Sequence, residues 1–258
     1  MGKVYLVGAG PGDPELLTLR AARLLKEATV VLHDSLVSRE VLALIGGARV
    51  IDVGKRCGTK LLTQQEINSL LIAYASQYED VIRLKGGDPT IFGRAGEEIE
   101  ALAGAGIAYE IVPGISSALA AAAAAGISLT DRRSASSVVF TTAHRGVDSE
   151  ATAWDRLVSS HSTLAIYMPG SSYHEIARQL QDAALSLQTP CVVVSHAGRP
   201  TQQVRWCDLL SLERMESMAA PTMLIVGECA NPMHIAEHCI RGVPVTDESQ
   251  TETLARPI

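Results

Sequence analysis

The chain has few cysteines and no apolar run long enough to cross a lipid bilayer. Its five cysteines are scattered, odd in number and never in C-x-x-C spacing, which argues against a disulfide framework and against a zinc knuckle. The most apolar stretch, 115–129, is interrupted by serines and a glycine and is shorter than the ~20 residues of a membrane-spanning helix. The first residues lack the apolar segment and cleavage site of a signal peptide. We therefore expect a cytoplasmic protein without a membrane partner.

An excess of positive charge is also missing. The sequence has 22 Lys+Arg against 28 Asp+Glu, a net charge of −6. Proteins that hold a phosphate backbone over much of their surface need a strong positive field, so we expect no nucleic-acid partner. Apolar residues make up 47% of the 258 residues and charged residues 19%. This composition is typical of a globular chain with room for one large or two small α/β domains.

Short β-branched runs alternate with segments of helical period in the first half of the chain. This alternation predicts a mainly parallel sheet with crossover helices. Thr63 followed by Glu66 has the spacing of a capping box, in which each side chain satisfies a free N–H of the first helical turn. The expected strands are 4–8, 30–34, 50–54, 81–84 and 111–112, and the expected helices are 15–27, 41–45 and one that begins at Thr63.

The second half has the same classes of element. No helical period separates the expected strands 191–195 and 204–207, and this spacing around 198–208 predicts a hairpin and hence a mixed sheet. Because Pro113-Gly114 interrupts the chain, we predict an α/β domain over 1–114, a second over 115–242 and a polar tail over 243–258. The other expected strands are 138–142, 164–168 and 223–226, with helices at 154–158 and 175–184.

A glycine-rich loop, Gly8 to Asp13, follows the first expected strand. It approaches the dinucleotide fingerprint G-x-G-x-x-G, but Asp13 stands at the third glycine and Pro11 lacks the N–H that would bind pyrophosphate. We therefore do not favour the interpretation of the chain as an NAD-dependent oxidoreductase. A second interpretation of the loop is a tight turn that needs glycine only for its backbone dihedral angles.

Glycines and charged residues recur after the expected strands. Each of the first four expected strands is followed by such a loop: Gly10-Pro11-Gly12, Asp34, Gly54-Lys55-Arg56 and 86–89. Because ligands of open parallel sheets gather at the carboxyl ends of the strands, these loops predict one small-molecule site.

In these loops and beyond them, the sequence resembles the tetrapyrrole methylases. The RLKGGDP-x-x-FGR block, with GKR and QEIN upstream, is specific to the subgroup that methylates uroporphyrinogen III, whereas the GPGD loop marks only the wider family. The matching segments are VGAGPGDPELLT (7–18), HDSLV (33–37), VGKR (53–56), QEIN (65–68), RLKGGDPTIFGRAGEE (83–98), VPGISSA (112–118), ISLTDR (127–132), Tyr167-Met168 and PTMLIVGE (221–228).

The resemblance implies a homodimer of two α/β domains, a mainly parallel N-terminal sheet and a mixed C-terminal sheet, with the active-site cleft between the domains. S-adenosyl-L-methionine would be the methyl donor and S-adenosyl-L-homocysteine its product. The methyl groups would pass to carbons 2 and 7 of uroporphyrinogen III, giving precorrin-2 for sirohaem, cobalamin or haem d1 synthesis. By position in the family motifs, the implied cofactor residues are Pro11, Gly86, Gly87, Asp88, Ile91, Phe92, Ser116, Ser117, Met168, Ala197 and Met223. The implied substrate residues are Arg132 and Met168, and the implied catalytic residues are Arg94 and Glu97.

A substrate with eight carboxylates requires a local cationic surface on a net-negative enzyme. The candidate cations are Lys55, Arg56, Lys60, Arg83, Lys85 and Arg94. Arginine suits this role because its planar fork pairs with a carboxylate bidentately. We expect Arg94 to be a carboxylate clamp oriented by Glu97, three residues further along a helix, rather than a base.

Other interpretations remain open at this level. The chain could methylate a later precorrin, an RNA or a protein, or it could be a ligand-binding module without catalysis. The segment His234–His238 matches the zinc motif H-x-x-E-H, but we expect a solvated helix face there and no metal site.

Overall fold

The computed structural model describes residues 2–54, 62–143, 154–159, 161–171 and 173–231. The chain packs as two compact units. The first contains the residues up to Ala121 together with His196–Gln202, and the second contains Ala122–Ser195 and the residues from Gln203 on. This division differs from the expected domains, 1–114 and 115–242. Those domain bounds stay a prediction. The expected tail, 243–258, lies outside the described residues.

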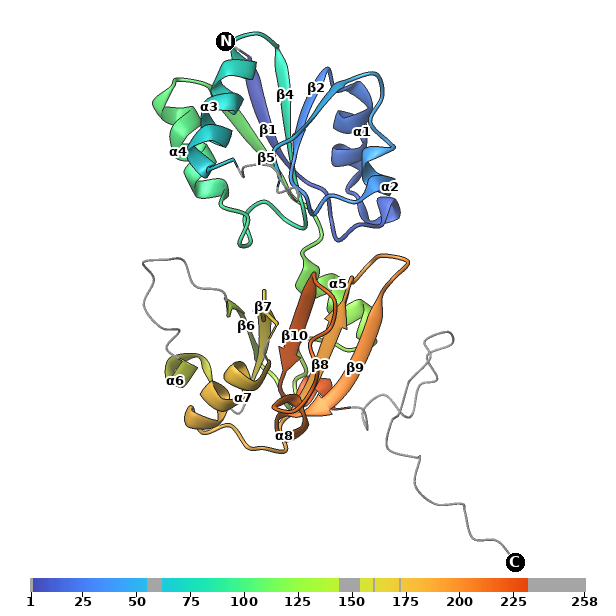
Figure 1. Cartoon of the computed structure of the whole chain (residues 1–258), viewed down its shortest axis with the longest axis vertical. Coiled ribbons are helices and arrows are strands. Elements are labelled where there is room, and N and C mark those ends of the chain that lie inside the picture. Colours follow the sequence, from blue (N-terminus) through green and yellow to red (C-terminus); the bar gives the residue numbers. More distant parts are fainter. Residues whose placement is uncertain (1, 55–61, 144–153, 160, 172, 232–258) are drawn as a thin grey trace, which may run out of the picture. The chain divides into compact units, whose positions relative to one another are not determined.

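The first unit is built on a five-stranded parallel sheet with strand order β3-β2-β4-β1-β5 (Figure 1). This confirms the parallel sheet expected from the sequence. The strands are β1 Lys3–Gly8, β2 Val30–His33, β3 Arg49–Asp52, β4 Asp80–Lys85 and β5 Ala108–Val112. The helices are η1 Pro14–Leu16, α1 Leu19–Glu27, α2 Arg39–Leu42, α3 Gln64–Ala75, α4 Ala95–Gly104 and α5 Ser117–Ala125, of which α5 continues into the second unit.

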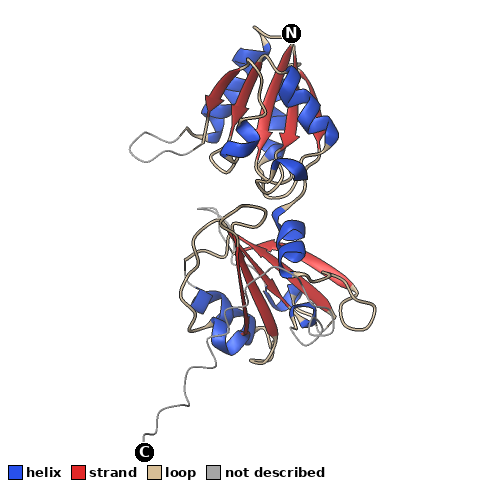
Figure 2. Cartoon of the chain, turned by 90° about the vertical axis from the view of Figure 1, so that its right-hand side faces the viewer, coloured by secondary structure: helices blue, strands red, loops and turns tan. Residues whose placement is uncertain are grey.

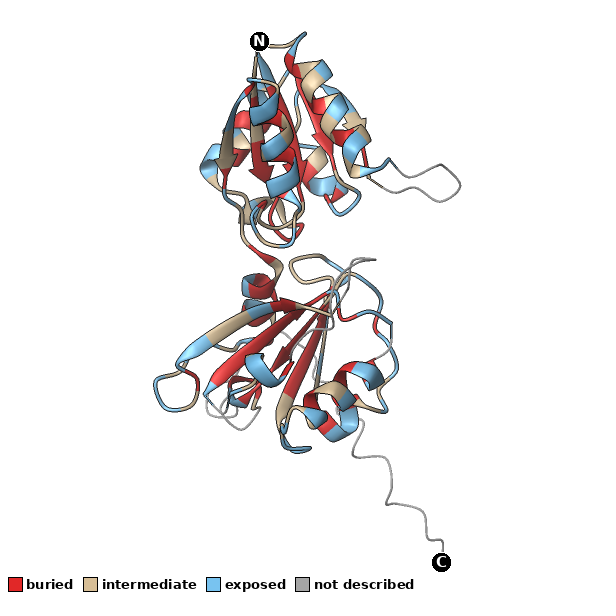
Figure 3. Ribbon diagram, turned by 90° about the vertical axis from the view of Figure 1, so that its left-hand side faces the viewer, coloured by how far each residue is buried: buried red, intermediate tan, exposed pale blue. Residues whose placement is uncertain are grey.

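Helices cover both faces of this sheet (Figure 2). Because side chains alternate along a strand, Val4 and Leu6 of β1 pack with α3 and α4, whereas Val7 packs with α1 and α2. The central strands β1, β2 and β4 are mostly buried, and exposed residues lie on the outer faces of the helices (Figure 3).

Two helix starts show how the local sequence sets the elements. The Thr63 capping box is present, with Thr63 Oγ1 accepting from the Glu66 N–H and the Glu66 carboxylate accepting from the Thr63 N–H, so α3 begins where expected. The single helix expected over 15–27 is wrong. Thr18 has an extended backbone and its hydroxyl accepts from the Ala21 N–H, so it caps α1 and separates that helix from the short η1.

The second unit contains a mixed five-stranded sheet with strand order β6-β7-β10-β8-β9. Only β6 and β7 pair in parallel, and β8 and β9 form the expected antiparallel hairpin. The strands are β6 Ser137–Thr142, β7 Ser162–Tyr167, β8 Pro190–Ser195, β9 Gln203–Asp208 and β10 Thr222–Val226. The helices are α6 Trp154–Leu157, α7 Tyr173–Asp182, α8 Leu209–Leu212 and η2 Glu228–Ala230.

The core of the second unit joins one face of its sheet to helices α6, α7 and α8. Trp154, Tyr173 and Leu212 of these helices are buried against apolar residues of β7, β8 and β10. The sequence did not predict α8, which Asp208 caps by accepting from the Ser211 N–H. Within the described part of the chain, no helix has the length and apolarity needed to span a membrane.

Candidate functional site

The loops after the strands of the first unit meet at the carboxyl edge of its sheet, as predicted. Gly10 and Gly87 exchange two backbone hydrogen bonds, Gly10 N to Gly87 O at 3.2 Å and Gly87 N to Gly10 O at 2.8 Å. These bonds join the loops after β1 and β4, and both glycines have a left-handed φ, +66° and +69°. The loop after β2 also meets the loops after β4 and β3: a Cβ on Gly86 would lie 3.0 Å from Leu36 Cβ, and one on Gly54 would lie 2.2 Å from Ser35 N.

The Ser116-Ser117 segment borders the Gly87 backbone. A Cβ built on Gly87 would lie 3.8 Å from Ser117 N and 3.9 Å from Ser116 Cα, which is ordinary contact distance. The Asp88 carboxylate fixes this neighbourhood, since its Oδ2 accepts from Gly114 N at 3.0 Å. The structure thus brings Gly86, Gly87 and Asp88 together with the two serines at the start of α5, and all five are among the predicted cofactor residues.

Gly114 is packed too tightly for any side chain. A Cβ on Gly114 would lie 2.4 Å from Gly87 O and 2.9 Å from Gly8 Cα. We expect Gly114→Ala to destabilise the fold by about 1–3 kcal/mol through overpacking of backbone against backbone. We also expect it to weaken ligand binding at the Gly87 loop, measured by calorimetry with S-adenosylhomocysteine. Gly104→Ala at the end of α4, with no atom within 4 Å of the added Cβ, is the matched control and should neither destabilise the fold nor weaken binding. Equal behaviour of the two variants would contradict this prediction.

The tip of the β8–β9 hairpin carries Ala197 and lies beside the loop after β1. Gly198, with φ +70°, packs so closely on Pro11 that a Cβ would lie 2.7 Å from Pro11 Cγ. Arg199 Nε donates to Pro11 O at 3.2 Å. The structure therefore places the segment of Ala197 against Pro11, two positions far apart in the sequence that were both predicted to hold the cofactor.

Arg94 and Glu97 form the predicted pair. Arg94 Nε donates to Glu97 Oε1 and a terminal guanidinium nitrogen donates to Oε2, both at 2.7 Å. Both side chains are at least half exposed, at 58% and 50%. The hydrogen bond to Arg94 lowers the pKa of the Glu97 carboxyl and raises the pKa of the guanidinium, so both groups are charged at neutral pH. This geometry agrees with an arginine clamp held by its neighbouring carboxylate.

Several non-glycine residues at or beside predicted site positions have a left-handed backbone. Phe92 has φ +51°, Arg94 +55°, Met168 +49° and His196 +51°. Such conformations cost about 1–3 kcal/mol each and concentrate at functional sites. Ile91 lies in the same loop as Phe92, and its N–H donates to Asp88 O at 3.3 Å.

Three predicted residues lie in the second unit. Met168 follows β7 and is 45% exposed, whereas Met223 of β10 is buried. Met223 pairs with Tyr167 in the sheet register, so Met168 and Met223 are neighbours. Arg132 is exposed in the turn that the Asp131–Ala135 bridge closes. No contact recorded for the described residues joins Arg132 to the two methionines.

Arg83 and Lys85 are not part of a cationic surface, so this expectation was wrong. They are 1% and 2% exposed, because alternation along β4 turns both toward α4. Glu98 Oε1 accepts from Arg83 Nε at 2.8 Å and from Lys85 Nζ at 3.0 Å. Arg83 also donates to Asp34 at the end of β2. Asp34, Arg83, Lys85 and Glu98 thus form a charge cluster of two basic and two acidic side chains, buried except for the partly exposed Asp34.

The balance of charge within this cluster is uneven. Burial and the neighbouring charge of Arg83 lower the pKa of Lys85. Burial also opposes the charge of Arg83, but Asp34 and Glu98 together raise the pKa of that guanidinium above its ordinary value. Glu98 Oε2 is buried and has no hydrogen-bond partner among the described residues. The charged forms of Arg83 and Lys85 are consequently both stabilised by the same Glu98 carboxylate. The sequence signal for this cluster was two basic residues on one face of a strand that is otherwise apolar.

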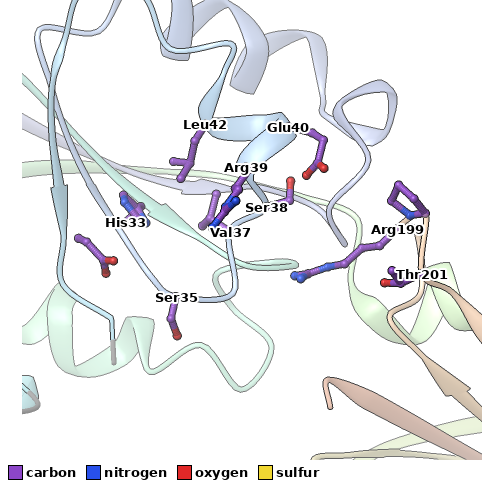
Figure 4. A pocket seen from close by; sticks show the side chains of 11 residues that line it. His33, Ser35, Val37, Ser38, Arg39, Glu40, Leu42, Arg199 and Thr201 are labelled. Carbon is purple, nitrogen blue, oxygen red and sulfur yellow. The ribbon is translucent and has the colours of Figure 1, made fainter. Parts of the chain in front are cut away.

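A pocket of about 530 Å³ opens at the same edge of the first unit (Figure 4). It lies between the end of β2, the start of α2 and the hairpin tip, and Arg199 forms one of its walls. Its lining contains cations and anions together and includes none of the predicted site residues. The lining residues are His33, Ser35, Val37, Ser38, Arg39, Glu40, Leu42, Asp52, Arg199, Pro200 and Thr201.

Some candidate residues lie outside the described part of the chain. These are the cations Lys55, Arg56 and Lys60 and the motif His234–His238. In the segments that the structure describes, no group of three or more metal-ligating side chains comes together.

Known proteins share this fold and much of the sequence. Residues 3–213 match the family described as Tetrapyrrole (Corrin/Porphyrin) Methylases. Siroheme synthase 1 of Pectobacterium atrosepticum is 47% identical over 235 residues, which are 90% of this chain and 49% of that protein. Siroheme synthase of Psychrobacter sp. is 46% identical, over 89% of this chain and 48% of its own length. The chain thus spans about half the length of the curated relatives it matches.

Two solved structures are similar to this chain along almost their whole length. The uroporphyrin-III C-methyltransferase of Thermus thermophilus, in complex with S-adenosylhomocysteine, has a TM-score of 0.79 and 36% identity, covering 89% of this chain and 94% of that one. A cobalt precorrin-4 methyltransferase has a TM-score of 0.76 and 29% identity, covering 89% and 96%. From its sequence match and its pair of sheets, the chain belongs to the tetrapyrrole methylase family.

Proposed function

We propose that the chain transfers methyl groups from S-adenosyl-L-methionine to carbons 2 and 7 of uroporphyrinogen III, giving precorrin-2. The observation that carries this proposal is the meeting of the Gly10, Gly87 and Ser116 segments within a tetrapyrrole methylase fold. The similarity to the Thermus uroporphyrin-III C-methyltransferase supports the substrate. The similarity to siroheme synthases supports a place in sirohaem synthesis, with cobalamin or haem d1 synthesis as the other destinations of the same product.

The residues at the carboxyl edge of the first sheet fit this methyl donor. Glycine at 86 and 87 leaves the backbone accessible, and the space beside Gly87 that a Cβ would fill is bordered by Ser116 and Ser117. In the proposal, the first unit contributes Pro11, Gly86, Gly87, Asp88, Ile91, Phe92, Ser116, Ser117 and Ala197 to cofactor binding. The second unit contributes Met168 and Met223.

The chain's own residues would act by holding and orienting the substrate. When bound, S-adenosylmethionine supplies an electrophilic methyl group, which a pyrrole carbon can attack without a covalent enzyme intermediate. Arg94, fixed by both oxygens of Glu97, would bind a substrate carboxylate, and Arg132 and Met168 would contact the macrocycle. The raised pKa of Arg94 makes it a clamp rather than a base. Holding the reacting atoms in line contributes up to ~7–11 kcal/mol in favourable cases.

The proposal extends to the assembly and its location. The resemblance of the motifs implies a homodimer, and we propose the cytoplasm as its location; no contact described above depends on either. Sedimentation velocity of the purified chain tests the dimer. The chain has a mass of 27.4 kDa, and a species of twice that mass is expected. A monomer at micromolar concentration would contradict that part of the proposal.

The decisive experiment supplies purified chain with S-adenosylmethionine labelled in its methyl group and with uroporphyrinogen III. Two labelled methyl groups per macrocycle are expected. Label on a later precorrin, but not on uroporphyrinogen III, would favour a sister enzyme such as the precorrin-4 methyltransferase that shares the fold. Calorimetry adds an independent readout, since S-adenosylhomocysteine should bind and NAD should not. Tight NAD binding without S-adenosylhomocysteine binding would overturn the proposal.

A further inference from the structure

Arg199 connects the loop after β1, which carries the proposed cofactor residue Pro11, to the loop after β2. It lies at the tip of the β8–β9 hairpin, and this tip, His196–Gln202, packs as part of the first unit. Its Nε donates to Pro11 O at 3.2 Å, in the loop after β1. A terminal nitrogen donates to Leu36 O at 2.5 Å, in the loop after β2. One half-buried guanidinium thus binds the backbone of both loops at once.

The stem of Arg199 also packs against the first of these loops. A Cβ on Gly12 would lie 2.9 Å from Arg199 Cγ and Nε, so the close approach of the side chain requires glycine there. Gly12 has φ +141°, in a region that favours glycine. The arginine and the glycine loop therefore fit one another through both shape and hydrogen bonding.

The loop after β1 is also bound at Gly12, the residue that follows Pro11. Ser38 Oγ, which is buried, donates to Gly12 O at 2.6 Å, and the same hydroxyl accepts from Val41 N at the start of α2. Successive carbonyls, those of Pro11 and Gly12, are thus bound by Arg199 and Ser38. In Figure 4, Arg199 extends from the hairpin toward the segment of Val37 and Ser38, with which it lines the pocket.

We propose that Arg199 is a positioning residue for the methyl-donor site, holding the Gly10–Asp13 loop in the shape that binds the nucleoside. The inference rests on the proposed function, because it takes Pro11 to be part of that site. Arginine suits the task because its fork presents donors in two directions, whereas a lysine ammonium is one point charge on a flexible stem. Arg199 touches backbone rather than substrate, so its effect passes through Pro11 and Gly12.

The test compares Arg199→Met and Arg199→Lys with the wild type and with Arg205→Met. Methionine keeps most of the stem but removes both donors. Arg205 is an exposed arginine on β9 of the same hairpin, which makes it the matched control. We expect Arg199→Met to weaken S-adenosylhomocysteine binding about tenfold in calorimetry, on the scale of one charge-assisted hydrogen bond. Arg199→Lys should fall between it and the wild type, and Arg205→Met should bind normally.

Two further readouts separate positioning from a general loss of structure. In steady-state assays the KM for S-adenosylmethionine should rise while kcat stays within about twofold, since Arg199 does not touch the reacting atoms. Amide hydrogen exchange of peptides covering 9–17 should quicken in the free variant while peptides from β7 and β10 are unchanged. If Arg199→Met does not fold, the lysine variant and its exchange pattern decide the matter.

The outcomes distinguish this inference from the proposed function. If the wild type fails to bind S-adenosylhomocysteine, the proposed function fails. If the wild type binds and both Arg199 variants bind equally well, with unchanged exchange at 9–17, the role of Arg199 is refuted while the proposed function stands. A fall in kcat with unchanged KM would also refute it.

Discussion

Glu98→Ala is expected to lower the free energy of unfolding by about 3–5 kcal/mol, because it strands two buried cations. Arg83 and Lys85 are each 2% or less exposed, and both bind the same Glu98 oxygen. After the substitution, Asp34 is the described carboxylate that still forms ion pairs with them, and it lies 3.9 Å from Lys85. Urea unfolding followed by circular dichroism measures the change, and a constant m-value shows that the transition is of the same kind.

A control and a compensating variant sharpen this prediction. Glu27 forms an exposed ion pair with Arg23 in α1, so Glu27→Ala should cost less than about 1 kcal/mol. Glu98→Leu combined with Lys85→Met removes one charge of each sign and leaves the Arg83–Asp34 pair. We expect this double variant to be more stable than Glu98→Ala alone, because no unpaired charge stays buried. Equal stability of Glu98→Ala and Glu27→Ala would show that the cluster does not behave as buried.

Arg94→Ala is expected to lower kcat/KM for uroporphyrinogen III about 10- to 100-fold, since a charge-assisted hydrogen bond contributes about 1.5–3 kcal/mol. Arg94→Lys should recover only part of the activity, because lysine cannot pair with a carboxylate bidentately. Glu97→Gln should also reduce activity by releasing the guanidinium from its fixed orientation. The measurement is the initial rate of methyl transfer at saturating S-adenosylmethionine.

The control for the Arg94 variants is Arg23→Ala, which removes an equally exposed arginine from an i,i+4 pair in α1. Its kcat/KM should equal that of the wild type. The binding of S-adenosylhomocysteine should be unchanged in Arg94→Ala, because the proposed contact is to the other substrate. Full activity of Arg94→Ala would remove this residue from the proposed site.

Much of the fold could be predicted because short-range patterns determine it. β-branched runs located the strands of both sheets to within a few residues, and the Thr63–Glu66 spacing located the start of α3. Convergence of the four loops followed from the parallel sheet alone, because all strands of such a sheet end at one edge. The helix split at Thr18 was missed, because a threonine can both continue a helix and cap one.

The charge cluster and the hairpin contact could not be predicted, for different reasons. Two basic residues on one face of an apolar strand can hint at burial, but the sequence does not show which carboxylate pairs with them, so Arg83 and Lys85 were counted as surface cations until the structure paired them with Glu98. The bond from Arg199 to Pro11 joins positions 188 residues apart, and no local pattern reports such a contact. The left-handed backbone at Phe92 and Arg94 was equally hidden, because these residue types disfavour it in isolation.

The insertion of His196–Gln202 into the first unit has a consequence for biosynthesis. Chains are made from the N-terminus, and domains usually fold in that order on the ribosome. The nascent parallel sheet therefore emerges with Pro11 uncovered, and the seven residues that pack on it arrive only after most of the second unit has been translated. Maturation of the ligand-binding edge is thus a late, long-range event, completed once the hairpin has closed.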